Sequence, residues 1–288
     1  MLKTHPVLPA LLTGAFVLAA GACTRPHETA PAPPPAASTH ASSAPTVAPS
    51  GLRLERVVML MRHGVRPPTK PQVTPPRTND QPWPKWTTDF GELTTHGYDA
   101  VRLLGEWDRA NWAARGLLPA AGCPAVADVD VAASSKSRTQ ATARALLEGL
   151  APGCHIDVSF PTDKHDDVVF HPLETGAMAI DADEAMRAVE AVMPPGGMAA
   201  EVKANAPLFE LLNHALGCTP GAACDISTMP AGLVRNENDR PDVGDPFSIA
   251  STASQTFLLE YLEGMPMKDV AWGRLNRDQI ATLLEFHP

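Results

Sequence analysis

Residues 57–61 form an unbroken apolar run, Val-Val-Met-Leu-Met, which stops abruptly at Arg62. A short apolar run that contains β-branched residues predicts a strand buried on both faces of a sheet. Arg62, His63 and Arg66 come directly after this run. Because ligands of open α/β sheets bind at the carboxyl ends of the strands, the pattern predicts an α/β fold with its ligand site at these residues.

The residue types at this predicted strand end indicate a phosphate site. Guanidinium groups such as those of Arg62 and Arg66 bind phosphate oxygens in pairs and keep their charge. Two neighbouring cations favour the neutral form of His63, and a neutral imidazole is a competent nucleophile. Gly64 is expected to let the backbone approach the ligand. The alternative is a structural strand whose end is merely solvated by charged residues.

Residues 62–68, Arg-His-Gly-Val-Arg-Pro-Pro, resemble the Arg-His-Gly-x-Arg-x-Pro hallmark of the histidine acid phosphatase family. Thr69 and Lys70 extend the resemblance to its bacterial periplasmic branch, which includes phytases and glucose-1-phosphatases. The resemblance implies that His63 becomes a phosphohistidine and that the motif arginines bind the phosphate. Thr69 and Lys70 are then expected to contact the rest of the substrate.

The same resemblance implies a fold and a domain order. The fold is α/β, with a mostly parallel sheet flanked by helices as in phosphoglycerate mutase, and with a smaller helical insertion domain. Residues 51–172 are expected to form the first part of the α/β core, residues 173–265 the helical insertion, and residues 266–288 a return to the core. No metal and no organic cofactor are expected, and the sequence contains no CxxC, HxH or HExxH pattern.

Arg138 is the candidate for a third phosphate ligand. Residues 126–132 alternate and predict a second strand, and a helix is expected to follow, ending near Leu150. Arg138 falls in the first turn of that helix, where a cation opposes the helix dipole unless an anion lies beside it. The family's third phosphate-binding arginine stands in an Arg-Thr context that Arg138 matches. The alternative is a surface arginine that reaches into solvent.

Further helices follow from capping residues and apolar periodicity. One is expected over residues 94–115. A second begins at Asp181 or Asp183 and is ended by the Pro-Pro-Gly-Gly sequence of residues 194–197. A third covers roughly residues 200–216, and a longer one opens at Pro246.

The first 50 residues are expected to lie outside the folded domain. Residues 1–23 combine a positive start, an apolar stretch and a small-residue cleavage site, as in a signal peptide with a lipoprotein box. Cys23 is the expected lipidation site. Residues 24–50 consist largely of Pro, Ala, Ser and Thr and predict a disordered tether. The chain is therefore expected to be exported, either to the periplasm or to an outer-membrane anchor.

Five cysteines are present, and setting Cys23 aside leaves an even number, as expected in an oxidising compartment. Cys218 and Cys224 bracket a short loop and are expected to pair, which leaves Cys123 to pair with Cys154. The resemblance to the periplasmic branch implies the same two bridges.

The net charge of −9 argues against a nucleic-acid partner. It does not argue against an anionic substrate, because a local arginine cluster outweighs distant charges within a screening length. The expected partner is a small phosphomonoester, and the membrane is expected to be contacted only through the lipid anchor.

The resemblance lacks one component. The family carries a His-Asp pair after a late strand, whose aspartic acid protonates the leaving oxygen. This sequence stops at Pro288 without such a strand, and its His165-Asp166 pair lies in a polar loop. The sequence is therefore expected to be C-terminally truncated, with an uncovered sheet edge and exposed apolar surface.

The sequence as a whole predicts an acid phosphatase, with a phytase as one form of it, that works through a phosphohistidine. A glucose-1-phosphatase-type sugar phosphatase is one alternative, and a phosphate-binding lipoprotein without turnover is another. A phosphoglycerate-mutase-type transfer shares the Arg-His-Gly start, but the export signal and the predicted disulfides argue against a cytosolic substrate.

Overall fold

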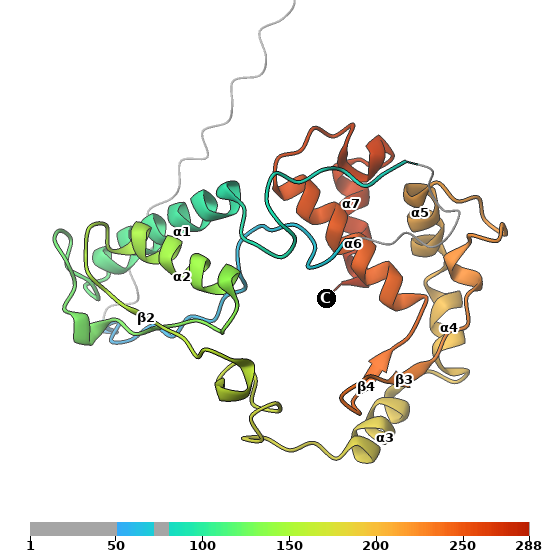
Figure 1. Ribbon diagram of the computed structural model, residues 1–288, viewed down its shortest axis with the longest axis horizontal. Coiled ribbons are helices and arrows are strands. Elements are labelled where there is room, and N and C mark those ends of the chain that lie inside the picture. The colour runs from blue at the N-terminus through green and yellow to red at the C-terminus, as the bar shows by residue number, and fades with distance from the viewer. Residues whose placement is uncertain (1–50, 72–80, 288) are drawn as a thin grey trace, which may run out of the picture. The chain divides into compact units, whose positions relative to one another are not determined.

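The computed structural model describes residues 51–71 and 81–287. Helix α1 spans Thr95–Ala114, and its cap Thr94 accepts a hydrogen bond from the backbone N–H of Gly97 (2.9 Å). Helix α2 spans Ser137–Leu150 and lies alongside α1 (Figure 1). Both helices agree with the expectation from the sequence.

The two helices approach each other through glycines. A Cβ built at Gly149 of α2 would lie 1.9 Å from the carbonyl oxygen of Arg102 in α1, and one at Gly105 would lie 2.3 Å from the carbonyl oxygen of Leu146. No larger residue fits at either position without a shift of the backbone. The crossing therefore fixes the position of α2, and with it Arg138, relative to α1.

The strands are short. β1 (Val131–Ala132) pairs in parallel with β2 (Val158–Ser159), and β3 (Leu233–Arg235) pairs antiparallel with β4 (Pro241–Val243). The strand predicted over residues 126–132 is thus reduced to its last two residues, because a 3₁₀ turn takes up its start. The architecture is mixed α/β and rich in helix.

The doubly buried strand predicted at residues 57–61 is wrong for the described structure. These residues run without regular secondary structure, Val58 is 89% exposed and Leu60 is 84% exposed. The physical reason is that no strand of the described residues lies beside them to bond their backbone or cover their faces. The exposure agrees with the predicted uncovered edge.

In the later part of the chain, α3 (Ala182–Val192) begins after its cap Asp181, as expected. The single helix predicted over residues 200–216 is instead two helices, α4 (Gly197–Ala204) and α5 (Ala206–Leu216). The break falls next to Pro207, which lies in the first turn of α5 and has no N–H to continue the earlier helix.

Helices α6 (Phe247–Leu262) and α7 (Arg277–Leu283) complete the helical part and lie together in Figure 1. Phe257 of α6 is fully buried. Trp83, from the loop before α1, stacks on Phe257 with ring centroids 5.8 Å apart.

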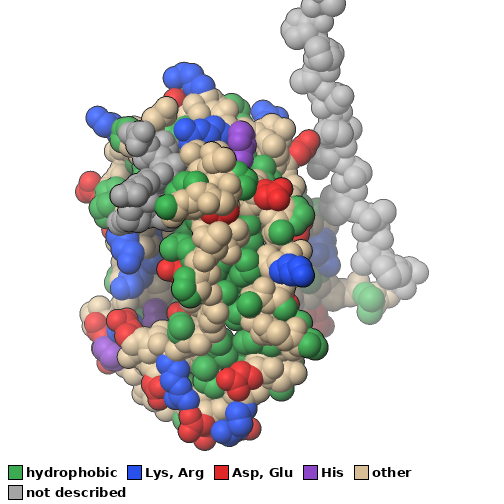
Figure 2. Space-filling model, turned by 90° about the vertical axis from the view of Figure 1, so that its right-hand side faces the viewer, with side chains coloured by type: hydrophobic (Ala, Val, Ile, Leu, Met, Phe, Trp, Pro, Cys, Tyr) green, Lys and Arg blue, Asp and Glu red, His purple; other side chains and the backbone are tan. Residues whose placement is uncertain are grey.

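Two disulfides, Cys123–Cys154 and Cys218–Cys224, are formed, as predicted. No helix within the described residues is long and apolar enough to cross a membrane. On the face shown in Figure 2, apolar side chains gather over the middle, and basic and acidic side chains are scattered mainly around them. The predicted signal peptide, the lipidation of Cys23 and the tether lie outside the described residues, and the domain limits remain predictions.

Candidate phosphate site

Residues 62–67, which carry the Arg-His-Gly-x-Arg motif, are held between α1 and α2. The backbone N–H of Gly64 donates to Thr142 Oγ1 of α2 (3.1 Å), and the backbone N–H of Thr94 donates to the carbonyl oxygen of Val65 (3.0 Å). A Cβ at Gly64 would lie 2.8 Å from the carbonyl oxygen of Gly97. Gly64 is therefore needed for contact with the start of α1, and its approach to a ligand stays a prediction.

His63 is held in one neutral form by two contacts. Its Nδ1 lies 2.8 Å from the carbonyl oxygen of Gly64, which can only accept a hydrogen bond. Its Nε2 receives a hydrogen bond from Nε of Arg66 (3.1 Å). Nδ1 therefore carries the proton, and the lone pair on Nε2 points toward the guanidinium.

Burial lowers the pKa of His63 to about 4, and the positive charges of Arg66, Arg138 and Arg62 contribute to this fall. Both causes disfavour the imidazolium ion. His63 is consequently neutral at any pH above about 4, which is the form that a nucleophile needs.

Arg66 lies almost completely buried beside this histidine. It is 6% exposed, and its Nη1 donates to the carbonyl oxygen of Pro67 (2.7 Å). Burial, followed by the charges of Arg138 and Arg62, lowers its pKa to about 10, so it remains charged at neutral and acidic pH. The three arginines thus repel one another, and an anion between them would relieve the repulsion.

Arg138 occupies the first turn of α2, as predicted. Its Nε is buried and has no hydrogen-bond partner among the described residues. Gly91, at φ +81°, lies against it: a Cβ built there would be 3.9 Å from Arg138 Nη1 and 3.6 Å from Thr69 Cα. Thr69 therefore borders Arg138, whereas Lys70 is exposed.

Sequence reasoning missed two residues that contact Arg62, Gln255 and His287, and a third, Ser251, that contacts His287. The side-chain oxygen of Gln255, in the orientation that satisfies its partners, lies 2.8 Å from Arg62 Nη2 and 2.6 Å from His287 Nε2. Ser251 Oγ lies 2.8 Å from His287 Nδ1, and Arg62 Nη1 lies 3.4 Å from His287 Nε2. Burial and the charge of Arg62 lower the pKa of His287. The available signal was that Ser251 and Gln255 stand four residues apart, on one face of α6.

No carboxylate of the described residues forms an ion pair or hydrogen bond with His63 or with the three arginines. His165-Asp166 lies in a short 3₁₀ turn, Lys164–Asp166, and forms no hydrogen bond or ion pair with His63 or the three arginines among the described residues. Between described residues no group of three or more His, Cys, Asp or Glu side chains is arranged to hold a metal ion. The arrangement is chemically a cationic cradle around a neutral imidazole.

Comparison with known proteins identifies the family. Residues 53–193 match the model of the histidine phosphatase superfamily (branch 2). The chain is 31% identical over 249 residues to phytase AppA of Escherichia coli, covering 82% of this chain and 57% of the relative. It is 30% identical over 241 residues to glucose-1-phosphatase of Salmonella typhimurium, covering 80% and 56% respectively.

Solved structures of phytases are also similar to this chain. Apo phytase of Hafnia alvei has a TM-score of 0.75 and 33% identity, over 84% of this chain and 61% of that one. Phytase of Citrobacter braakii has a TM-score of 0.71 and 32% identity, over 82% and 59%. The chain spans somewhat more than half the length of these relatives. With the Arg-His-Gly-x-Arg motif held between α1 and α2, these matches show that residues 53–193 are a histidine phosphatase superfamily (branch 2) domain.

Proposed function

We propose that this site hydrolyses phosphomonoesters through a phosphohistidine intermediate on His63. The observation that carries the proposal is the neutral, Nδ1-protonated His63, whose Nε2 lone pair points into a cluster of three arginines. A nucleophile and a dianion-binding cradle are thereby placed together, which is what transfer of a phosphoryl group requires.

In the first step, the phosphate of the substrate binds to Arg62, Arg66 and Arg138. Nε of Arg66, which donates to His63 Nε2 in the structure, then donates to a phosphate oxygen and releases the Nε2 lone pair. Nε2 attacks phosphorus, the P–N bond forms, and the ester P–O bond breaks. The three guanidinium groups stabilise the charge on the equatorial oxygens.

In the second step, water attacks the phosphohistidine. The P–N bond breaks, a P–O bond to the water oxygen forms, and inorganic phosphate leaves. The protons of the water pass to the phosphate product and the solvent, and His63 returns to its neutral form. Its low pKa keeps it from being trapped as imidazolium.

The leaving alcohol needs a proton, and no carboxylate of the described residues is bonded to the site. General acid catalysis commonly contributes about 10²–10⁴-fold in rate. An aryl phosphate, whose leaving group is stable as an anion, is therefore expected to react far faster than an alkyl phosphate. The same observation favours a second candidate function, in which the site binds phosphate without turnover.

The substrate class that we propose is based on the similar proteins. The similar proteins are named as phytases and glucose-1-phosphatases, and one of the similar structures is a phytase in complex with myo-inositol hexakis sulphate. We therefore propose inositol phosphates or sugar phosphates as substrates. The position of Thr69 beside Gly91, which also neighbours Arg138, supports the proposal that Thr69 contacts the part of the substrate beyond the phosphate.

The test is hydrolysis of 4-nitrophenyl phosphate and of an alkyl phosphate at mildly acidic pH, together with phosphate binding by calorimetry. Wild type is compared with His63→Ala, and His155→Ala serves as the matched control because His155 is exposed and remote from the motif in sequence. We expect aryl phosphate turnover in wild type and in the control, and background rates in His63→Ala.

Turnover that persists in His63→Ala would exclude the phosphohistidine. Folded wild type that binds phosphate but hydrolyses neither substrate would establish the binding-only function. Failure to bind phosphate would exclude both.

We also propose that the protein is exported and anchored through Cys23. Two structural disulfides support an oxidising compartment. Fractionation of cells that express wild type or Cys23→Ser tests the anchor, since wild type is expected in the membrane fraction and the variant in the soluble periplasmic fraction. Equal distribution of the two would argue against lipidation.

A further inference from the structure

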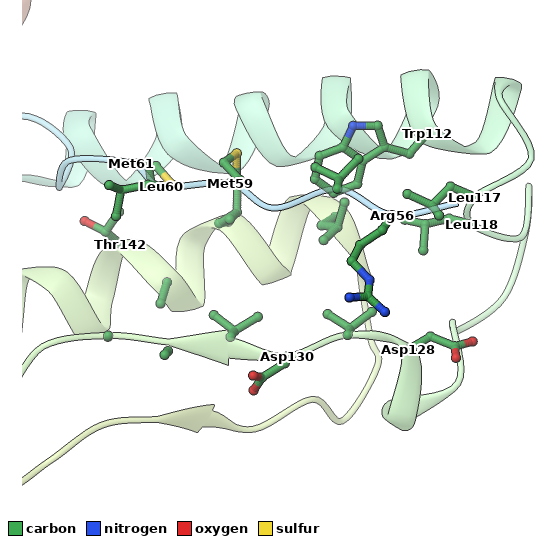
Figure 3. A pocket seen from close by; sticks show the side chains of 18 of the residues that line it. Arg56, Met59, Leu60, Met61, Trp112, Leu117, Leu118, Asp128, Asp130 and Thr142 are labelled. Atoms are coloured by element: carbon green, nitrogen blue, oxygen red, sulfur yellow. The ribbon is translucent and has the colours of Figure 1, made fainter. Parts of the chain in front are cut away.

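Arg62 differs from the other two arginines of the site because burial does not hold it. Arg66 is 6% exposed and Arg138 has a buried Nε, whereas Arg62 is exposed. The stretch before Arg62 borders a groove of about 920 Å³, along which Figure 3 shows residues 59–61. Residues 54–61 form no backbone–backbone hydrogen bond with any other described residue. An exposed arginine samples many rotamers, so Arg62 needs contacts of its own to bind phosphate in one place.

Gln255 supplies these contacts. In the orientation of the amide that satisfies its partners, the side-chain oxygen of Gln255 lies 2.8 Å from Arg62 Nη2 and 3.3 Å from Arg62 Nη1. Both terminal nitrogens of the guanidinium can therefore donate to one oxygen. Gln255 stands on α6, and Ala253 and Phe257 of the same helix belong to the hydrophobic core. A helix that is packed in the core is a rigid support for such a contact.

His287 fixes the orientation of the Gln255 amide. The oxygen of Gln255 also lies 2.6 Å from His287 Nε2, and because an amide oxygen only accepts hydrogen bonds, Nε2 carries the proton. Nδ1 of His287 then accepts from Ser251 Oγ (2.8 Å). Burial and the charge of Arg62 lower the pKa of His287, which favours this neutral ring. The reversed amide would turn its NH₂ group toward two other donors, so only one orientation is favourable.

The groups that hold Arg62 are uncharged. Among the described residues, no carboxylate forms an ion pair or a hydrogen bond with Arg62. A carboxylate would bind the guanidinium more strongly than an amide does, but its negative charge would oppose a phosphate bound to the same arginine. An amide oxygen orients the guanidinium and leaves its positive charge available.

We propose that Gln255, oriented by His287 and Ser251, is a positioning residue that holds the Arg62 guanidinium for phosphate without offsetting its charge. Gln255 acts through Arg62. The consequence for phosphate rests on the proposed function, but the order of the Arg62 side chain can be measured in the absence of phosphate.

Two substitutions separate the holding of Arg62 from the charge beside it. Gln255→Met keeps about the same size and removes the acceptor, whereas Gln255→Glu keeps an acceptor and adds a negative charge. Thr252→Ala is the matched control, because Thr252 is exposed on the same helix. All variants are checked by circular dichroism.

Two readouts are taken from each variant of the full chain. The first is ¹⁵N NMR of the Arg62 guanidinium, in which slow rotation about the Cζ–Nη bonds reports hydrogen bonding, and Arg62→Lys assigns the signal. The second is calorimetric binding of inorganic phosphate near neutral pH.

The two variants are expected to differ in the first readout. In Gln255→Met the Arg62 guanidinium should rotate freely, and phosphate binding should weaken about tenfold, since a hydrogen bond to a charged group is lost. In Gln255→Glu the guanidinium should stay restrained while phosphate binding weakens about tenfold or more, because a negative charge lies beside the anion. The deficit of Gln255→Glu should shrink with added salt. A purely structural role of Gln255 would not separate the two readouts.

Three results would overturn the proposal. Equal rotation of the Arg62 guanidinium in wild type and Gln255→Met would mean that Gln255 does not hold it. Wild-type phosphate affinity in Gln255→Glu would mean that the charge of the acceptor does not matter. Weak phosphate binding by Gln255→Met with a restrained Arg62 would make Gln255 a direct phosphate ligand instead. If wild type binds no phosphate, the proposed function is refuted, and the rotation of Arg62 alone decides whether Gln255 holds the arginine.

Discussion

The substitution Gly149→Ala tests whether the α1–α2 crossing places the phosphate site. The added Cβ would lie 1.9 Å from the carbonyl oxygen of Arg102, 2.8 Å from the backbone nitrogen of Glu106 and 2.9 Å from the carbonyl carbon of Arg102. All three are backbone atoms, so no side-chain rotation relieves the clash. The helices must separate by more than an ångström.

Two effects compete in the free energy of unfolding. Alanine is more favourable than glycine inside a helix by about 1 kcal/mol. Overpacking commonly costs about 1–3 kcal/mol, and a backbone clash this close falls at the upper end. We therefore expect Gly149→Ala to lower the free energy of unfolding by about 2 kcal/mol, which for a chain of this size lowers Tm by roughly 4–8 °C.

The measurement is urea unfolding followed by circular dichroism, with 4-nitrophenyl phosphate turnover or phosphate binding recorded on the same preparation. Gly232→Ala is the control, because a Cβ there meets nothing within 4 Å and its φ is not positive. The control is expected to be neutral or slightly stabilising. If Gly149→Ala instead stabilises the protein by about 1 kcal/mol, helix propensity decides and the close-packing argument is refuted.

Three further results are expected. Burial raises the pKa of the Glu260 carboxyl to about 8, so the folded protein retains a proton that the unfolded chain releases above its ordinary value of 4.5. The stability of wild type should therefore fall relative to Glu260→Gln as pH rises from about 4.5 to 8, and Tm values of the two that move in parallel across this range would contradict it. NMR titration of the His63 ring should give a midpoint near pH 4, and a midpoint near 6.5 would mean that the ring is not buried among the arginines. Removing the Cys123–Cys154 bridge, which spans 31 residues, should cost about 4 kcal/mol, against about 2 kcal/mol for Cys218–Cys224, which spans 6. Equal losses in denaturant unfolding of the two double Cys→Ser variants would contradict the dependence on loop length.

Local signals in the sequence predicted much of the helical structure. The cap Thr94 and the cap Asp181 marked the starts of α1 and α3, because a side chain that accepts a hydrogen bond from the first turn is a local feature. The same reasoning missed the break between α4 and α5, where Pro207 outweighed the periodic pattern.

The candidate site was predicted in part. His63, Arg62, Arg66 and Arg138 were singled out, and the structure brings them into mutual electrostatic contact. The residues around Arg62 were not found, because Gln255 and His287 lie 193 and 225 positions away from it and only the tertiary fold places them there. The tautomer of His63 was likewise invisible, since it depends on the geometry of the two contacts that the ring makes.

The sequence by itself determined the chemistry and the local structure. It contains a motif of permanent cations around one imidazole, four cysteines that pair, and helices whose capping residues directly precede them. Tertiary structure decided whether residues 57–61 are buried, and it decided the role of Gly64. An apolar run indicates which side chains a segment would bury, but burial needs a partner surface. No strand of the described residues supplies one to Leu60. A glycine in a motif indicates that no side chain fits at that position, but only the tertiary structure shows that the close approach of Gly97 is the reason.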